Sequence, residues 1–249
     1  MASVALRGVA LALGAAATLA ATAAAGAAAA TLGPLVQAGA PGPGWRAVNL
    51  PQQKMPATRY TAETVDGREA LRVQADASYG NLVHELPPGD APRLLQWSWR
   101  LQQPNPAVDL RTKAGDDSAV KVCMSFDLAA GRVPFVERQL LRLARARTGQ
   151  ALPAATLCWV WGHAEPAGTL LPNAYTRRVR YLVLRNAQSA TGVWMEERRD
   201  VAADFRRAFG DEVAAGEPLP PLTAVIVAGD ADNTGGSSVA HVSGLRAEP

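Results

Sequence analysis

The chain has 249 residues, a length that allows one large domain or two small ones. Lysine and arginine total 25 against 22 aspartate and glutamate residues, which gives a formal net charge of +3. This near balance argues against a nucleic-acid-binding protein, because such proteins concentrate basic residues on one face.

The first thirty residues have the layout of a secretory signal peptide. Arg7 supplies a basic start, an apolar run begins at Val9, and the stretch ends in small residues near Ala30. Cleavage there would leave a chain that begins at Thr31, so we expect a periplasmic or secreted protein. The alternative is a retained membrane anchor. A stretch so rich in alanine and glycine is weakly hydrophobic, so we expect no stable membrane span after cleavage.

Residues 31–44 are rich in glycine, proline and alanine and are expected to be a linker. One domain is expected over 45–249, where short apolar runs alternate with turn residues as in β-strands. Asp66-Gly67 lies between two such runs and predicts a tight hairpin turn. The expected strands are 45–50, 58–65, 70–75, 81–86, 94–101, 119–128, 156–161, 178–184, 192–197, 223–228 and 239–245.

Residues 135–147 predict an amphipathic helix. Val136, Leu140 and Leu143 lie on one stripe, and the arginines of this segment lie mostly off it. A basic amphipathic helix can bind a membrane surface. The commoner arrangement, which we expect here, is a solvated helix that covers the end of a sheet.

A second, shorter helix is expected at residues 201–209, with Asp200 as its N-cap and Gly210 at its end. Strands and helices do not alternate regularly, which disfavours a parallel α/β sheet. We therefore predict a mainly β fold: an antiparallel β-sandwich of jelly-roll type with two short helices.

Cys123 and Cys158 are the only cysteines, and both lie in predicted strands. An exported chain meets an oxidising compartment, so we expect a disulfide between them. The alternative is two separate buried thiols. Two cysteines at this spacing, without a histidine partner, do not indicate a zinc site.

Three polar clusters each lie at the end of a predicted strand. One precedes the strand at 119–128, one follows the strand at 156–161, and one follows the strand at 223–228. Trp194 is included among the candidate ligand-binding residues because its polar sequence context suggests an exposed ring. The candidate ligand-binding residues are Asp116, Asp117, Asn173, Tyr175, Trp194, Asp230, Asp232 and Asn233.

Asp230, Asp232 and Thr234 place oxygen ligands at alternate positions before a glycine, as an EF-hand does at its start. The twelfth position is His241 instead of a bidentate glutamate, and strands flank the loop, so an EF-hand is excluded. A Ca²⁺ site of another geometry is one interpretation, with help from Asp116-Asp117. An ordinary turn is the other, because Asp, Asn and Gly are common turn formers.

Paired carboxylates are the other chemistry that these clusters allow. Glycoside hydrolases hold two carboxyl groups about 5–10 Å apart around the bond that they cleave. The sequence has no Gly-x-Ser-x-Gly elbow, no His-x-x-x-His spacing and no phosphate or dinucleotide motif. The candidate carboxylates are Asp116, Asp117, Asp230 and Asp232, with Glu197 as an outside candidate.

The tryptophans have two interpretations. Trp97 and Trp99 share one face of a strand, as do Trp159 and Trp161, and the apolar neighbours on those faces indicate a core. The alternative is an aromatic platform that stacks on sugars. Trp45 has a more polar context and is expected at the surface.

The order of these motifs resembles a family of exported bacterial proteins known only as a domain of unknown function. The likeness covers roughly residues 45–245, and it implies one exported domain without an assigned activity. The motifs are Leu95-Gln-Trp97-Ser-Trp99-Arg100, Gly115-Asp116-Asp117, Trp159-Val-Trp161-Gly162, Trp194, Glu197-Arg198-Arg199-Asp200, Asp204-Phe205, Phe209-Gly210 and Asp230-Ala-Asp232-Asn233-Thr234.

These observations lead to one main functional prediction, an exported, non-catalytic β-sandwich that binds a glycan or another cell-envelope component. A polysaccharide hydrolase with paired carboxylates is the first alternative. A structural envelope protein that binds another protein is the second. No cofactor other than Ca²⁺ is suggested, and fold alone does not decide among these functions.

Overall fold

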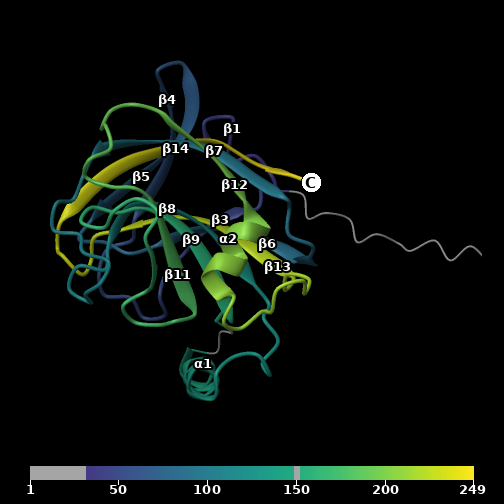
Figure 1. Ribbon diagram of the computed structural model, residues 1–249. Coiled ribbons are helices and arrows are strands. Elements are labelled where there is room, and N and C mark those ends of the chain that lie inside the picture. Colours follow the sequence, from purple (N-terminus) through teal and green to yellow (C-terminus); the bar gives the residue numbers. More distant parts are fainter. Residues whose placement is uncertain (1–31, 149–151) are drawn as a thin grey trace, which may run out of the picture.

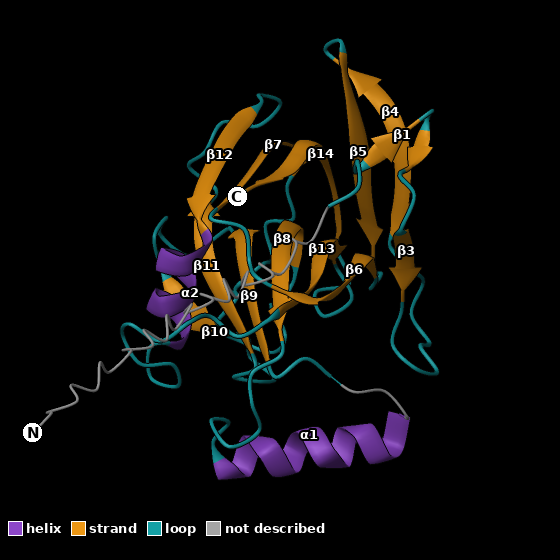
Figure 2. Ribbon diagram, turned by 90° about the vertical axis from the view of Figure 1, so that its right-hand side faces the viewer, coloured by secondary structure: helices purple, strands orange, loops and turns teal. Residues whose placement is uncertain are grey.

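The computed structural model describes residues 32–148 and 152–249 and shows two β-sheets packed face to face (Figures 1 and 2). The seven-stranded sheet has the order β10 (Leu170–Pro172), β11 (Val179–Arg185), β9 (Ala155–Trp161), β8 (Ser118–Phe126), β13 (Leu222–Asp230), β6 (Asn81–Gly89) and β3 (Trp45–Val48). The five-stranded sheet has the order β12 (Met195–Asp200), β7 (Leu94–Gln103), β14 (Ser237–Glu248), β5 (Arg68–Asp76) and β4 (Arg59–Val65).

The pairing of the strands confirms the predicted mainly β sandwich. Neighbouring strands of the two sheets run antiparallel except for β9 and β11, which are parallel. The predicted turn at Asp66-Gly67 joins β4 to β5, and both residues have positive φ, 52° and 76°. Two central residues with positive φ form the turn type whose twist suits a two-residue hairpin.

Three short strands were not predicted from the sequence. β1 (Val36–Gln37) and β2 (Ala40–Pro41) form a small hairpin inside the expected linker, and Leu35 beside it is buried in the core. The third unpredicted strand is β10, at one edge of the seven-stranded sheet. Strands of two or three residues are too short to show the alternation on which strand prediction depends.

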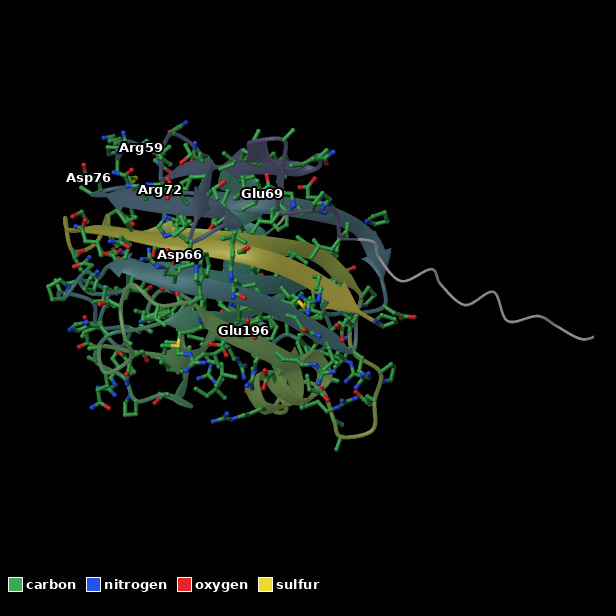
Figure 3. The ribbon with its side chains drawn as sticks, turned by 90° about the horizontal axis from the view of Figure 1, so that it is seen from above. Arg59, Asp66, Glu69, Arg72, Asp76 and Glu196 are labelled. Carbon is green, nitrogen blue, oxygen red and sulfur yellow. A yellow bond between two sulfur atoms is a disulfide. The ribbon has the colours of Figure 1, made fainter. Side chains whose placement is uncertain are left out.

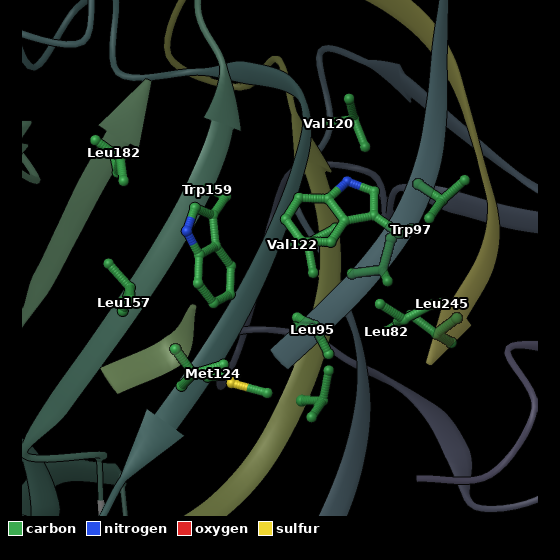
Figure 4. Packing of buried hydrophobic residues seen from close by; sticks show 14 of the residues in the cluster. Leu82, Leu95, Trp97, Val120, Val122, Met124, Leu157, Trp159, Leu182 and Leu245 are labelled. Carbon is green, nitrogen blue, oxygen red and sulfur yellow. The ribbon is translucent and has the colours of Figure 1, made fainter. Parts of the chain in front are cut away.

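The four paired tryptophans belong to the main core, and Figure 4 shows two of them, Trp97 and Trp159. The rings of Trp97 and Trp159 face each other across the two sheets at a centroid distance of 5.5 Å, and those of Trp99 and Trp161 at 5.7 Å. The core interpretation is therefore confirmed, and the alternative of a sugar platform is wrong. Trp45 corrects another expectation, because it is buried against the ring of His84 at 5.3 Å.

β8 is buried on both faces, although the alternation in its sequence predicts only one face in a core. The outer face of the seven-stranded sheet lies beneath the loop that precedes β8, where Val108 and Leu110 pack over Cys123 and Cys158. These two cysteines are directly opposite each other on β8 and β9 and form a disulfide. The predicted disulfide is therefore confirmed.

The two helices differ in how they meet the sandwich. α2 (Val201–Phe209) packs closely on it, and the carboxylate of Asp200 accepts a hydrogen bond from the backbone N–H of Ala203 at 2.8 Å, as predicted for an N-cap. Gly210 follows with an ordinary φ of −65°. It is needed because a Cβ there would lie 2.5 Å from the carbonyl oxygen of Arg206.

α1 (Phe135–Thr148) stands apart from the two sheets (Figure 2). The expectation that its apolar stripe covers the end of a sheet is wrong, because Val136, Leu140 and Leu143 are all exposed. Periodicity defines an apolar stripe but not the direction in which that stripe points. Within residues 32–148 and 152–249, no helix combines the length and apolarity needed to cross a membrane.

Candidate functional site

The three polar clusters meet over the outer face of the seven-stranded sheet. Asp230 at the end of β13 pairs in register with Ser118 at the start of β8, which places the third cluster beside the first. The loop between β10 and β11 adds the second cluster, because Asn173 donates a hydrogen bond to Asp116. Seven of the eight candidate ligand-binding residues therefore lie together around these loops, although no side-chain hydrogen bond links Asp232 to the other six, and Trp194 lies elsewhere.

Asp117 ties the loop after β13 to the loop before β8. Its carboxylate accepts hydrogen bonds from the backbone N–H of Asn233 at 3.2 Å and of Thr234 at 2.8 Å. The Asn233 side-chain amide and the Thr234 hydroxyl also donate to it, at 3.1 and 2.7 Å. Asp117 is almost fully buried, so these bonds fix the shape of both loops.

A buried ion pair between Lys121 and Asp230 lies beneath these loops. Asp230 also accepts a hydrogen bond from the backbone N–H of Ser118 at 2.7 Å. Burial acts to lower the pKa of Lys121, but the charge of Asp230 outweighs it and leaves the pKa well above its ordinary value. Sequence analysis missed Lys121, although a lysine between apolar residues in a predicted strand is itself a signal of a buried partner.

Asp116 is a buried carboxyl group whose two oxygens are only partly satisfied. Its Oδ2 accepts from the side-chain amide of Asn173, which also donates to the hydroxyl of Tyr181 at 2.8 Å, and its Oδ1 is buried without a partner. Burial raises the pKa of Asp116 from 3.8 to about 6, more than the charge of Lys121 lowers it. Tyr181 is a further member of the network that sequence analysis did not single out.

Tyr175 carries the network to the surface. Its side chain is 57% exposed, and its hydroxyl donates to Oδ1 of Asn233 at 2.5 Å and to the carbonyl oxygen of Lys113 at 3.1 Å. The ammonium group of Lys113 lies 5.2 Å from the centre of the tyrosine ring. Asp232 is half-buried, and its Oδ1 is buried without a partner. Burial, followed by the charge of Asp230, raises the pKa of Asp232.

Trp194 belongs to the other sheet, whose outer face Figure 3 shows from above. Its ring lies 6.5 Å from that of His241 on β14, and the guanidinium group of Arg68 lies 5.5 Å from its centre. His241 contacts Glu63 on β4 at 2.5 Å, and burial lowers the pKa of His241. Trp194 therefore lies apart from the three polar clusters, just before β12, and its ring is half-buried where its polar context suggested an exposed one.

Glu197, the outside candidate for catalysis, is buried on β12 and points into the molecule. Its Oε1 accepts a hydrogen bond from the indole N–H of Trp99 at 2.9 Å and from Nε of Arg185 at 2.7 Å. These contacts link a core tryptophan to the edge of the seven-stranded sheet. They give Glu197 a structural role.

The residues predicted to bind calcium are occupied by other contacts. Asp230 faces Lys121, and the Thr234 hydroxyl donates to Asp117 and accepts from the side-chain amide of Asn105 at 2.8 Å. Within the part of the chain that the structure describes, no three His, Cys, Asp or Glu side chains are grouped so that they could hold a metal ion. A Ca²⁺ site remains a prediction, and thermal unfolding with calcium and with EDTA tests it.

An antiparallel β-sandwich with a polar network over one outer face is the class that this structure defines. Residues 43–246 match the family described as protein of unknown function (DUF3047), so the chain belongs to that family. This confirms the resemblance to an uncharacterised domain family. The search of curated proteins found no match.

Two solved structures illustrate the likeness at the level of the fold. The family 11 carbohydrate-binding module from Clostridium thermocellum, in complex with a β-1,3-1,4-mixed-linked tetrasaccharide, is 10% identical with a TM-score of 0.35, over 83% of this chain and 89% of that one. The catalytic domain of Humicola grisea Cel12A, in complex with a soaked thio cellotetraose, is 12% identical with a TM-score of 0.41, over 82% and 92%.

Proposed function

We propose that this protein is an exported, non-catalytic β-sandwich that binds a glycan or another hydroxyl-rich envelope component at the surface around Tyr175. The observation that carries the proposal is the exposed Tyr175 ring, whose hydroxyl is held by Asn233 and by the Lys113 carbonyl. An aromatic ring that is fixed before the ligand arrives loses little conformational entropy on binding. Its flat face suits the apolar C–H face of a sugar ring.

The neighbours of Tyr175 supply polar groups of both kinds. The carboxylate of the half-buried Asp232 is an acceptor, and the ammonium group of Lys113 is a donor. A ligand rich in hydroxyl groups uses both. The buried Asp117 and the half-buried Asn173 then act as supports, because they hold the loops that carry these groups.

Binding to soluble polysaccharides, measured by affinity electrophoresis and then by calorimetry on residues 31–249, tests this proposal. Tyr175→Ala is expected to weaken binding about tenfold or more, as truncation of a central aromatic contact does. Tyr175→Phe keeps the ring and loses only its anchoring hydroxyl, so a smaller loss is expected. Phe135→Ala removes an equally exposed aromatic ring on α1 and serves as the matched control. Wild-type affinity in Tyr175→Ala would refute the proposal.

A polysaccharide hydrolase is the alternative that one observation favours, because the pKa of Asp116 is raised to about 6 and a general acid needs a raised pKa. Its carboxylate neighbours Asp117 and Asp230 accept hydrogen bonds from internal donors, which supports binding over catalysis. Release of reducing sugar by the wild type, lost in Asp116→Asn while binding is kept, would favour the hydrolase.

A further inference from the structure

The outward side of α1 carries an exposed apolar stripe. Phe135 is 66% exposed, Val136 67%, Leu140 55% and Leu143 48%. Val136, Leu140 and Leu143 are spaced by four and three residues, so they form one line along the helix. Large apolar side chains gathered in this way on a surface mark an interaction site.

Contacts on the other side of α1 hold this stripe away from the sandwich. Glu137 lies 3.6 Å from Nε of Arg178, and Leu141 packs against the main core. A guanidinium N–H of Arg138 donates to the carbonyl oxygen of Ala130 at 3.1 Å. The helix is thus attached through one side and lies below the two sheets (Figure 2), and its apolar stripe is exposed.

The charges along α1 indicate what the stripe meets. Arg138, Arg142 and Arg145 lie on the side of the helix away from the apolar line, and Glu137, the acidic residue of the helix, is directed at Arg178. Arg142 and Arg145 form no ion pair with any residue that the structure describes. The helix therefore has an exposed apolar stripe on one side and a cationic polar side. This division is typical of helices that lie in the plane of an anionic bilayer, where the apolar side is buried and the cations are attracted to the lipid phosphates.

We propose that α1 is a membrane-surface helix that docks the protein on an anionic lipid bilayer. The apolar stripe enters the boundary between head groups and acyl chains, and the arginines bind lipid phosphates. This inference goes beyond the proposed glycan binding and does not depend on it, because α1 contributes no residue to the network around Tyr175.

Co-sedimentation with vesicles tests the inference on residues 31–249, which contain every described element and lack the apolar leader. We expect binding to vesicles with 30% phosphatidylglycerol in phosphatidylcholine, weaker binding to phosphatidylcholine alone, and loss of binding as salt is raised. The triple variant Val136→Ser/Leu140→Ser/Leu143→Ser should bind vesicles at least about tenfold more weakly, because it removes the apolar area that enters the bilayer. Arg142→Gln/Arg145→Gln should lose about fivefold for each arginine.

The matched control is Arg198→Gln/Arg246→Gln, which removes two exposed arginines from the five-stranded sheet on the far side from α1 (Figure 1). This control and Tyr175→Ala should both bind vesicles as the wild type does. A wild-type protein that stays in the supernatant with anionic vesicles at low salt would overturn the inference. Vesicle binding that neither α1 variant changes would also overturn it. A purified protein that binds through the stripe, while vesicles do not bind, would overturn it as well.

Discussion

At the scale of single residues, the most unusual feature is the number of buried charged groups beneath the loops around Tyr175. Lys121 and Asp230 are both buried and paired, and Asp116 and Asp117 are buried within the same network. Removing charges from water is costly unless each finds a partner, and here the partners come from three separate segments. The network therefore stabilises one arrangement of the loops.

The Lys121–Asp230 pair leads to a prediction about stability. Lys121→Met leaves the Asp230 carboxylate buried without a counter-charge, so the free energy of unfolding should fall by about 3–5 kcal/mol. Adding Asp230→Asn removes that charge and keeps an acceptor for the Ser118 N–H. The double variant should therefore unfold at a higher urea concentration than Lys121→Met alone. A double variant less stable than Lys121→Met would show that the charge on Asp230 is not what destabilises the single variant.

Asp116 gives a prediction about pH. Its pKa in the folded protein is about 6, above the ordinary value of 3.8, so the folded state keeps a proton that the unfolded chain releases. The contribution of this group to stability is fully present below pH about 4 and is lost as the pH rises through 6.

Urea unfolding from pH 4 to pH 8 measures this contribution as the difference between the wild type and Asp116→Asn. The variant is needed because burial also raises the pKa values of Asp230, Asp232 and Glu165, which shift the wild-type curve in the same direction. The stability advantage of the wild type over the variant should shrink as the pH rises. A difference that stays constant from pH 4 to pH 8 would contradict the assignment.

At the scale of elements, the disulfide links two adjacent central strands, β8 and β9. Its cysteines are 35 residues apart in the chain, and the segment between them contains α1. Cross-linking a loop of that length restricts the unfolded chain and stabilises the fold by up to about 4 kcal/mol.

Cys123→Ala/Cys158→Ala should therefore lower the free energy of unfolding by about 2–4 kcal/mol, measured with urea under oxidising conditions. The wild type in reducing agent should approach the stability of the double variant, provided that the agent reaches the buried bond. Equal stability of wild type and double variant under oxidising conditions would mean that the cross-link contributes nothing.

The two helices show how the same kind of pattern leads to different placements. α2 is short, capped by Asp200, and its apolar residues Phe205 and Phe209 are buried, with Phe205 packed against Phe126 at a ring distance of 4.5 Å. α1 is longer and less strongly amphipathic than α2, and its apolar stripe is exposed. Each stripe was predictable from spacing. The surface against which a stripe packs was not predictable, because the residues of that surface lie elsewhere in the chain.

At the scale of the whole molecule, the extent of the folded unit is the open question. Leu35 precedes the expected domain start at residue 45, yet it is buried with the residues of the main core. If residues 31–44 are only a linker, Leu35→Ala should change stability by less than about 0.5 kcal/mol. If the β1–β2 hairpin is part of the fold, the loss should be about 2–5 kcal/mol within a single unfolding transition.

We expect the larger loss, and urea unfolding of Leu35→Ala beside the wild type measures it. Leu50→Ala is the control, because Leu50 is exposed in a loop after β3. A stability change as small as that of the control would leave the domain start at residue 45.

The sequence by itself determined the local features of this protein. Alternation identified the strands, Asp66-Gly67 its hairpin turn, and Asp200 the helix cap, because each depends on neighbouring residues alone. It also placed the polar clusters at the ends of strands. Only the tertiary structure decided that three of these clusters meet, that Lys121 pairs with Asp230, and that Trp194 lies on the other sheet. Those outcomes depend on which distant strands pair, and that pairing is set by the packing of the whole core.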